Sequence, residues 1–185
     1  ASNHNDMLTR THLSGLMEIE QVIPSTSPAM DIQVSSNFER LLFDLSDREA
    51  AWLRTAMQDF RANGQLPLSE ALITRLRNIF DADRASELEV EETIADVHSA
   101  TGQFIDPHTA VAVSVARRLE AGSSPIAIMS TAHPAKFGDV VQDATGVAPA
   151  QPEEIKDLYG RTESCTDLPN ELNAIMEFVS SATNA

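Results

Sequence analysis

Residues 125–137 read Pro-Ile-Ala-Ile-Met-Ser-Thr-Ala-His-Pro-Ala-Lys-Phe, a short apolar run followed at once by polar groups. The run 126–129 is too short for a helix and lies between a proline and hydroxyl residues, a pattern that predicts a buried strand. In open α/β sheets ligands bind beyond the carboxyl ends of the strands, so we expect Ser130 and Thr131 to lie where a ligand is contacted. The alternative is local, because the same residues can cap a helix that begins near Pro134.

Most other apolar residues recur at the spacing of amphipathic helices, and polar residues mark where those helices begin. The pattern Ser-x-x-Glu, typical of a capping box that satisfies free backbone amides, occurs at 36–39, 46–49 and 86–89. Aspartate followed by proline predicts a further helix start at 106–107. The helices expected from these signals span about 37–45, 50–63, 67–80, 86–97, 107–121 and 168–179.

The helix expected after Asp106 is apolar around nearly its whole circumference, and we expect it to end at Gly122. A helix without a polar face belongs in an interior, packed closely against something such as a sheet. Apart from 126–129, only residues 30–34 alternate in a way that predicts a strand. Since one strand cannot form a sheet, its neighbours are expected to come from outside this sequence. The predicted fold class is therefore mainly α with few strands.

The composition limits the partners that the chain can have. Of its 185 residues 42% are apolar, which is enough for a substantial core. Its 13 lysines and arginines face 28 aspartates and glutamates, giving a formal net charge of −15 that disfavours nucleic acid and anionic membranes as partners. The single cysteine, Cys165, cannot form an internal disulfide, and the sequence shows no secretion signal or membrane-spanning apolar run. We therefore expect a cytoplasmic protein.

Several kinds of catalytic site are disfavoured by the residues present. The five histidines show none of the spacings of a metal site. Cys165 lies in an acidic, hydroxyl-rich stretch that does little to activate a thiol. The scattered glycines form no phosphate-binding loop. Lys136 and Lys156 are the only lysines, and neither has an obviously desolvated setting that would suit covalent catalysis by an amine.

Four stretches, taken together, point to one enzyme family. They are Asn-His-Asn-Asp-Met-Leu-Thr-Arg at 3–10, Thr-Ser-Pro-Ala-Met-Asp-Ile-Gln-Val-Ser-Ser-Asn-Phe-Glu-Arg at 26–40, Asp-Pro-His-Thr-Ala-Val-Ala at 106–112 and Ser-Thr-Ala-His-Pro-Ala-Lys-Phe at 130–137. In this order they resemble the C-terminal portion of threonine synthases. The resemblance implies part of an α/β enzyme of fold type II that uses pyridoxal 5'-phosphate (PLP) and converts O-phosphohomoserine and water into threonine and phosphate, as a carbon–oxygen lyase acting on a phosphate ester.

The same resemblance implies that the family's Schiff-base lysine and its glycine-rich phosphate-binding loop both lie upstream of residue 1. This chain would then hold no catalytic residue, would have the N-terminal part of the same enzyme as its partner, and would be inactive alone. The implied division is an extended connection with motifs near the active site (1–35), a helical segment (36–102), and the C-terminal part of the PLP-binding α/β domain with a terminal helix (103–185). The alternative is an acidic helical module for protein interaction without an active site, which the charge and the missing lysine and loop favour.

The resemblance assigns a cofactor contact to the hydroxyl of Thr131, with Ser130 as the alternative. Thr131 would contact the pyridine nitrogen of PLP. A hydroxyl can hydrogen-bond a neutral ring nitrogen without bringing the charge that an aspartate brings. Asp106 and His108 open the apolar helix, and structural capping is the role that we expect of both.

The resemblance also places six residues near the substrate. These are Asn3, Asn5, Asp6, Arg10, Arg40 and Lys136. The guanidinium of Arg40 would pair either with the phosphate of the substrate or with groups around Glu39. The ammonium of Lys136 would either face that phosphate or serve at the surface or as a helix cap.

Overall fold

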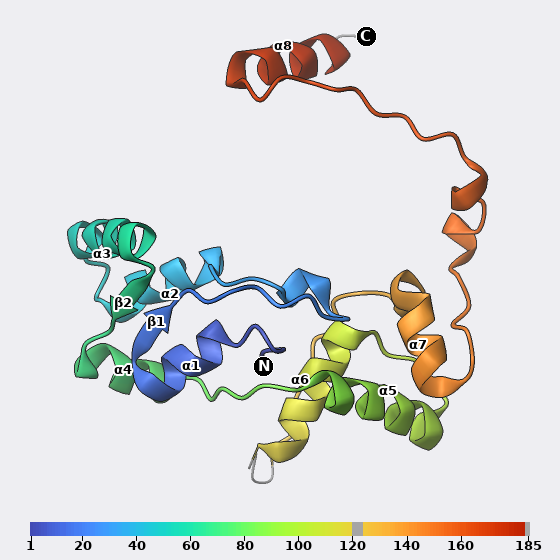
Figure 1. Ribbon diagram of the computed structural model, residues 1–185, viewed down its shortest axis with the longest axis horizontal. Coiled ribbons are helices and arrows are strands. Elements are labelled where there is room, and N and C mark those ends of the chain that lie inside the picture. Colours follow the sequence, from blue (N-terminus) through green and yellow to red (C-terminus); the bar gives the residue numbers. More distant parts are fainter. Residues whose placement is uncertain (120–123, 184–185) are drawn as a thin grey trace. The chain divides into compact units, whose positions relative to one another are not determined.

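A computed structural model describes residues 1–119 and 124–183 of the chain (Figure 1). The chain divides into two units, with the boundary between residues 150 and 151. The described part is mainly helical with one small sheet, so the predicted fold class is confirmed. The elements are α1 (Met7–Ser14), β1 (Leu16–Glu18), η1 (Pro28–Met30), α2 (Ser36–Leu45), α3 (Ala50–Asn63), β2 (Gln65–Pro67), α4 (Glu70–Arg77), α5 (Glu87–Thr101), α6 (Pro107–Arg118), η2 (Pro134–Phe137), α7 (Gly138–Thr145), η3 (Glu153–Ile155), η4 (Leu158–Gly160) and α8 (Leu172–Thr183), where η marks a 3-10 helix.

The sheet consists of β1 and β2, two short strands that pair antiparallel with Met17 opposite Leu66. Each strand follows a helix that ends at a glycine in the left-handed region, Gly15 after α1 and Gly64 after α3. Their φ angles are 79° and 72°, which favour residues without a Cβ atom. These two glycines therefore turn the chain from each helix directly into the sheet.

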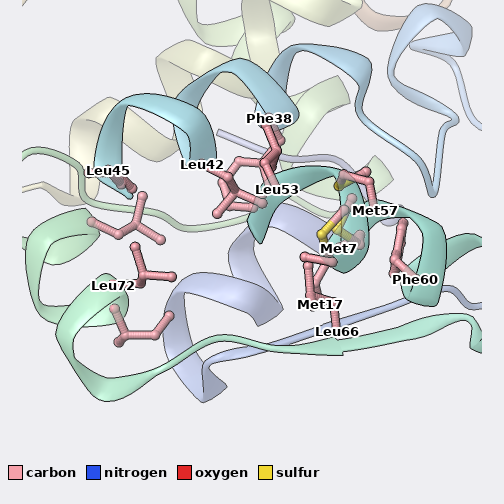
Figure 2. Close-up of a cluster of buried hydrophobic side chains, with 13 residues drawn as sticks. Met7, Met17, Phe38, Leu42, Leu45, Leu53, Met57, Phe60, Leu66 and Leu72 are labelled. Carbon is pink, nitrogen blue, oxygen red and sulfur yellow. The ribbon is translucent and has the colours of Figure 1, made fainter. Parts of the chain in front are cut away.

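The elements α1 to α4 and the sheet enclose one hydrophobic core (Figure 2). Phe60, Leu42 and Met17 have no exposed surface there. Burial of a side chain of this size contributes about 1.5–3 kcal/mol to stability. Truncating Phe60 to alanine would cost about 3–5 kcal/mol, because the rigid surroundings would leave a cavity.

A second core forms between α5, α6 and α7. Ile94, Val111 and Val141, one from each of these helices, are completely buried. The expectation that the apolar helix after Asp106 is an interior helix is confirmed, since most of its first two turns are buried. Its close neighbour is the helix α5, however, and not a sheet. The helix ends at Arg118 and Leu119 is extended, so the predicted span to residue 121 is too long; Gly122, its expected stop, lies outside the described residues.

Two of the predicted helix starts are confirmed. The Ser86 hydroxyl accepts the amide of Glu89, and the Glu89 carboxylate accepts the amide of Ser86, which completes a capping box at α5. At α6 the Asp106 carboxylate accepts the amides of His108 and Thr109, with proline in the first helical position.

The predictions of the two other capping boxes are wrong. Ser36 already belongs to α2, whose N-cap is Ser35 and has no side-chain hydrogen bond. Ser46 ends α2, and its hydroxyl donates backwards to the carbonyl of Phe43. The chain then turns through Asp47 and Arg48, both with positive φ, before α3 begins. The N-cap of α3 is Glu49, which makes no side-chain cap, so a Ser-x-x-Glu pattern alone does not predict the cap.

Neither predicted strand forms within the described part of this chain. Residues 126–129 form no strand, and Met129 is 76% exposed. Met30 ends η1, and residues 31–34 follow it without strand pairing. A strand needs a neighbour to satisfy its backbone groups, and within the described residues the apolar run has none.

Two helices begin later than predicted. α4 starts at Glu70, because the Ser69 hydroxyl caps it and the preceding residues pair in β2. α8 starts at Leu172, since a tight turn joins the amide of Glu171 to the carbonyl of Pro169 at 2.7 Å. The predicted start of this helix at residue 168 is therefore wrong.

The second unit contains η3, η4 and α8. Along α8 the apolar side chains at 172, 175, 176 and 179 recur at helical spacing and are 40–73% exposed. Across residues 1–119 and 124–183, no helix combines the length and the apolar character needed to cross a membrane.

The capping box of α5 predicts a pH dependence of stability. Hydrogen bonds from the amide and hydroxyl of Ser86 lower the pKa of Glu89 from its ordinary value. A carboxyl group whose pKa is lower in the folded state stabilises the fold above its unfolded pKa and loses this effect as the pH falls through the folded value. The melting temperature of the Glu89→Gln variant should therefore fall less between pH 7 and pH 3 than that of the unsubstituted protein.

Thermal denaturation followed by circular dichroism at both pH values measures this difference. Glu92→Gln, at an exposed position on the same helix, is the matched control. Equal acid sensitivity of the Glu89→Gln variant and the control would contradict the assignment.

Candidate active site

The first turn of α6 connects segments that lie far apart in the sequence. The Nε2 atom of His108 accepts the backbone amide of Ala29 at 3.2 Å. The hydroxyl oxygens of Thr109 and Ser130 are 3.4 Å apart. The rings of His108 and Phe137 are in contact, with centroids 4.8 Å apart. Three of the four stretches that carry the family resemblance therefore meet at this helix start.

A buried carboxylate organises this helix start. Asp106 has no exposed surface and accepts the amide of His108 at 2.9 Å and the amide of Thr109 at 3.4 Å. The Thr109 hydroxyl also donates to it, and the Nδ1 atom of His108 lies 2.9 Å from it. Because Nε2 accepts the amide of Ala29, the ring proton is on Nδ1 and donates to Asp106. The expected capping role of Asp106 is confirmed, whereas the side chain of His108 does not cap α6 and instead links Asp106 to Ala29.

The fourth stretch joins through the side chain of Asn3, which is completely buried. Its amide donates to the hydroxyls of Ser25 and Ser27 at 2.8 and 3.0 Å and to Asp31 at 2.8 Å. Asn5 donates to Asp31 at 2.9 Å. The segment 25–31 is thus fastened to the N-terminal motif on one side and to His108 on the other.

A cavity of about 130 Å³ lies beside this network. Asn3, Asn5 and Ala29 line it together with apolar side chains and Ser35. Residues of the 3–10 and 26–40 stretches, 15 or more positions apart in the sequence, therefore share one small hollow.

Asp6 and Arg10 form an ion-pair network instead of meeting this cavity. The Arg10 guanidinium pairs with Asp6 at 2.9 Å and with Glu20 at 2.9 Å. The other carboxylate oxygen of Asp6 pairs with Arg84 at 3.0 Å. Since acidic groups already surround Arg10, its charge is largely compensated within the protein.

Arg40 and Lys136 are both exposed. Lys136 lies on η2 with its ammonium 5.6 Å from the ring centroid of Phe137, which is within range of a cation–π contact. Among the described residues, neither Arg40 nor Lys136 forms an ion pair with an acidic group. The alternative in which Arg40 pairs with groups around Glu39 is therefore not observed as an ion pair.

Different residues of the stretch 130–137 make local and accessible contacts. The Nδ1 atom of His133 accepts the amide of Ala135 at 3.1 Å and so caps η2. The local capping that was the alternative for this stretch is therefore made by His133. Ser130 and Thr131 are both exposed and make no such cap, which leaves their hydroxyls accessible to a ligand.

Sequence reasoning missed two participants in this cluster. Thr109 joins Asp106 to Ser130, and Phe137 supports the ring of His108. A signal for Thr109 was present, since a threonine at the third helical position lies beside the N-cap aspartate. No sequence signal pairs Phe137 with His108, because 28 intervening residues separate them. Over the described ranges, no group of three or more histidine, cysteine or acidic side chains could hold a metal ion.

Comparisons with known proteins agree with the family resemblance. A family model described as "Threonine synthase, C-terminal" matches residues 109–179. The threonine synthase of Pseudomonas aeruginosa is 42% identical over 186 residues, which cover 100% of this chain and 40% of that protein. The crystal structure of PLP-bound threonine synthase from Brucella melitensis matches with a TM-score of 0.88 at 45% identity. The crystal structure of the yeast threonine synthase matches with a TM-score of 0.80 at 33% identity. Each match covers 100% of this chain and 40% of the other chain.

The fold is therefore that of the C-terminal portion of a PLP-dependent enzyme of fold type II. The chain belongs to the threonine synthase family. It spans about 40% of the length of the curated and structural relatives that it matches.

The buried carboxylate of Asp106 predicts a strong effect on stability. Asp106→Ala removes the helix cap, worth about 1 kcal/mol, and leaves buried donors of His108 and Thr109 unpaired. We expect a loss of at least about 2 kcal/mol in the free energy of unfolding, measured by urea denaturation. Asp139→Ala, which removes an exposed aspartate from the first turn of α7, should cost less than about 1 kcal/mol. Equal losses in the two variants would show that Asp106 does not organise the cluster.

Proposed function

We propose that this chain forms the C-terminal part of the active site of an enzyme that converts O-phosphohomoserine and water into threonine and phosphate. The observation that carries this proposal is the meeting of three family stretches at the start of α6, with the fourth joined to them through Asn3 and with Ser130 and Thr131 exposed. The reaction is that of a PLP-dependent carbon–oxygen lyase acting on a phosphate ester. The N-terminal part of the same enzyme, in the cytosol, is the proposed partner.

The residues present fit a cofactor with a neutral ring nitrogen. When bound, PLP withdraws electrons from the substrate at the reacting carbon. The hydroxyl of Thr131, or alternatively that of Ser130, would hold the pyridine nitrogen. The carboxylate of Asp106 is separated from Ser130 by the hydroxyl of Thr109 and is already occupied by buried donors. A neutral hydroxyl, and not a carboxylate, is therefore what this site offers the ring.

The substrate assignments fall into two groups. Asn3 and Asn5 line the cavity and hold its wall, so we propose that they shape the substrate pocket. Lys136 and Arg40 are exposed cations that form no ion pair within the described part of the chain, which suits contact with the substrate phosphate. Arg10 and Asp6 are occupied with each other, and we propose that they act by holding α1 in place. We also propose the division at 1–35, 36–102 and 103–185, with the cofactor contacts in the last part.

The cofactor contact is tested with the full-length enzyme. Thr131→Val removes the hydroxyl at nearly constant shape, whereas Thr131→Ser keeps it. We expect the valine variant to bind PLP and turn over O-phosphohomoserine about tenfold less well or worse, with the serine variant close to the unsubstituted enzyme. Phosphate release and PLP dissociation measure both effects.

Ser130→Ala tests the alternative contact in the same assays. A larger loss in this variant than in Thr131→Val would move the contact to Ser130. Unchanged PLP affinity in both variants would contradict a hydroxyl contact to the ring nitrogen.

We predict that the isolated chain forms no covalent link with PLP. Its two lysines, Lys136 and Lys156, are both exposed, so neither amine has the desolvated pocket that favours a covalent link. We expect no absorbance band of lysine-bound PLP when the cofactor is added to residues 1–185, whereas the full-length enzyme should show one. A stable band, together with borohydride labelling of either lysine, would refute this.

A further inference from the structure

We infer that His108 is a positioning residue of the proposed site, whose imidazole holds the segment 25–31 and the segment 130–137 in one fixed arrangement. The inference rests on the proposed function, because that function gives the two segments their roles. It goes beyond helix capping, since the atom that reaches the first segment is the far nitrogen of the ring.

Each part of the His108 side chain contacts a different element. Nδ1 faces Asp106 at the start of α6, Nε2 accepts the amide of Ala29 in η1, and the ring packs against Phe137 at the end of η2. His108 is 9% exposed, whereas Ala29 is exposed, so the imidazole and not the amide is the buried partner of this hydrogen bond. Loss of the imidazole removes the protein acceptor that fixes the position of the Ala29 amide.

The carboxylate of Asp106 decides which nitrogen can accept. It accepts a hydrogen bond from the protonated Nδ1, and this leaves the lone pair of Nε2 to accept the amide of Ala29. Neither a lysine nor an arginine could replace this imidazole, because their side chains carry donors only. The site therefore requires an acceptor at the position of Nε2.

The two segments held by His108 carry the proposed substrate and cofactor contacts. Ala29 lines the 130 Å³ cavity with Asn3 and Asn5. Phe137 ends the stretch that begins with Ser130 and Thr131. Loss of the imidazole would loosen the cavity wall and the cofactor-contacting stretch together, so substrate affinity and the environment of bound PLP should change together.

A matched pair of substitutions in the full-length enzyme isolates the acceptor. The side-chain oxygen of His108→Gln can reach the position of Nε2, whereas that of His108→Asn reaches only the position of Nδ1. Ala29→Pro removes the donor from the other side, since proline has no amide hydrogen. The three readouts are KM for O-phosphohomoserine, the absorbance spectrum of bound PLP, and hydrogen exchange in a peptide covering 25–31.

We expect His108→Asn to raise KM by about tenfold, to shift the PLP spectrum and to speed exchange in 25–31 by about tenfold. His108→Gln should stay within about threefold of the unsubstituted enzyme in KM and exchange. Ala29→Pro should raise KM as His108→Asn does, and combining the two should add little, because both remove one hydrogen bond. If His108→Asn does not fold, the comparison of Ala29→Pro, which lacks the hydrogen bond, with His108→Gln, which keeps it, tests the same contact.

Equal impairment by His108→Asn and His108→Gln would overturn the inference, because capping and packing would then explain the residue. So would a lower melting temperature with unchanged KM, spectrum and hydrogen exchange. The proposed function is checked separately by turnover in the unsubstituted full-length enzyme. If that enzyme did not consume O-phosphohomoserine, the proposed function would fail, and exchange in 25–31 would still decide whether His108 holds this segment.

Discussion

The described structure around the candidate site depends on one buried carboxylate, that of Asp106. It accepts the first amides of α6, fixes the tautomer of His108 and accepts a hydrogen bond from the hydroxyl of Thr109. The two side chains are thereby held with the Nε2 atom of His108 and the hydroxyl oxygen of Thr109 placed to make one further contact each. Those atoms contact Ala29 and Ser130, so a helix cap becomes the point at which distant stretches are joined.

A second polar network connects the two hydrophobic cores of the first unit. Asp6 pairs with Arg10 beside the first core and with Arg84 on the connection leading to α5. Arg118 of α6 reaches the same connection, pairing with Asp83 and with Glu89 of α5 at 2.8 Å each. Exposed ion pairs contribute little singly, but a network anchored on Asp6, whose side chain is only 10% exposed, can hold the connection in place.

Local signals predicted those features whose partners lie within one helical turn. The caps at Ser86 and Asp106 were predictable because an N-cap side chain needs only the amides two or three residues ahead. The same signal failed at Ser46, where a left-handed turn through Asp47 and Arg48 redirected the chain. The strand expected at 126–129 failed for a different reason, since apolar character indicates burial but a strand also requires a neighbouring backbone.

The sequence by itself determined the helical character, the start of α6 and the four stretches that identify the threonine synthase family, because helical periodicity and caps are local and the motifs are read in order along the chain. Only the tertiary structure decided that Asn3 and Asn5 are bound to the segment 25–31, that Arg10 is compensated by acidic groups, and that His108 reaches Ala29. Those contacts join residues up to 79 positions apart. No local spacing specifies such a pair, since it forms only when separately folded helices and loops pack together.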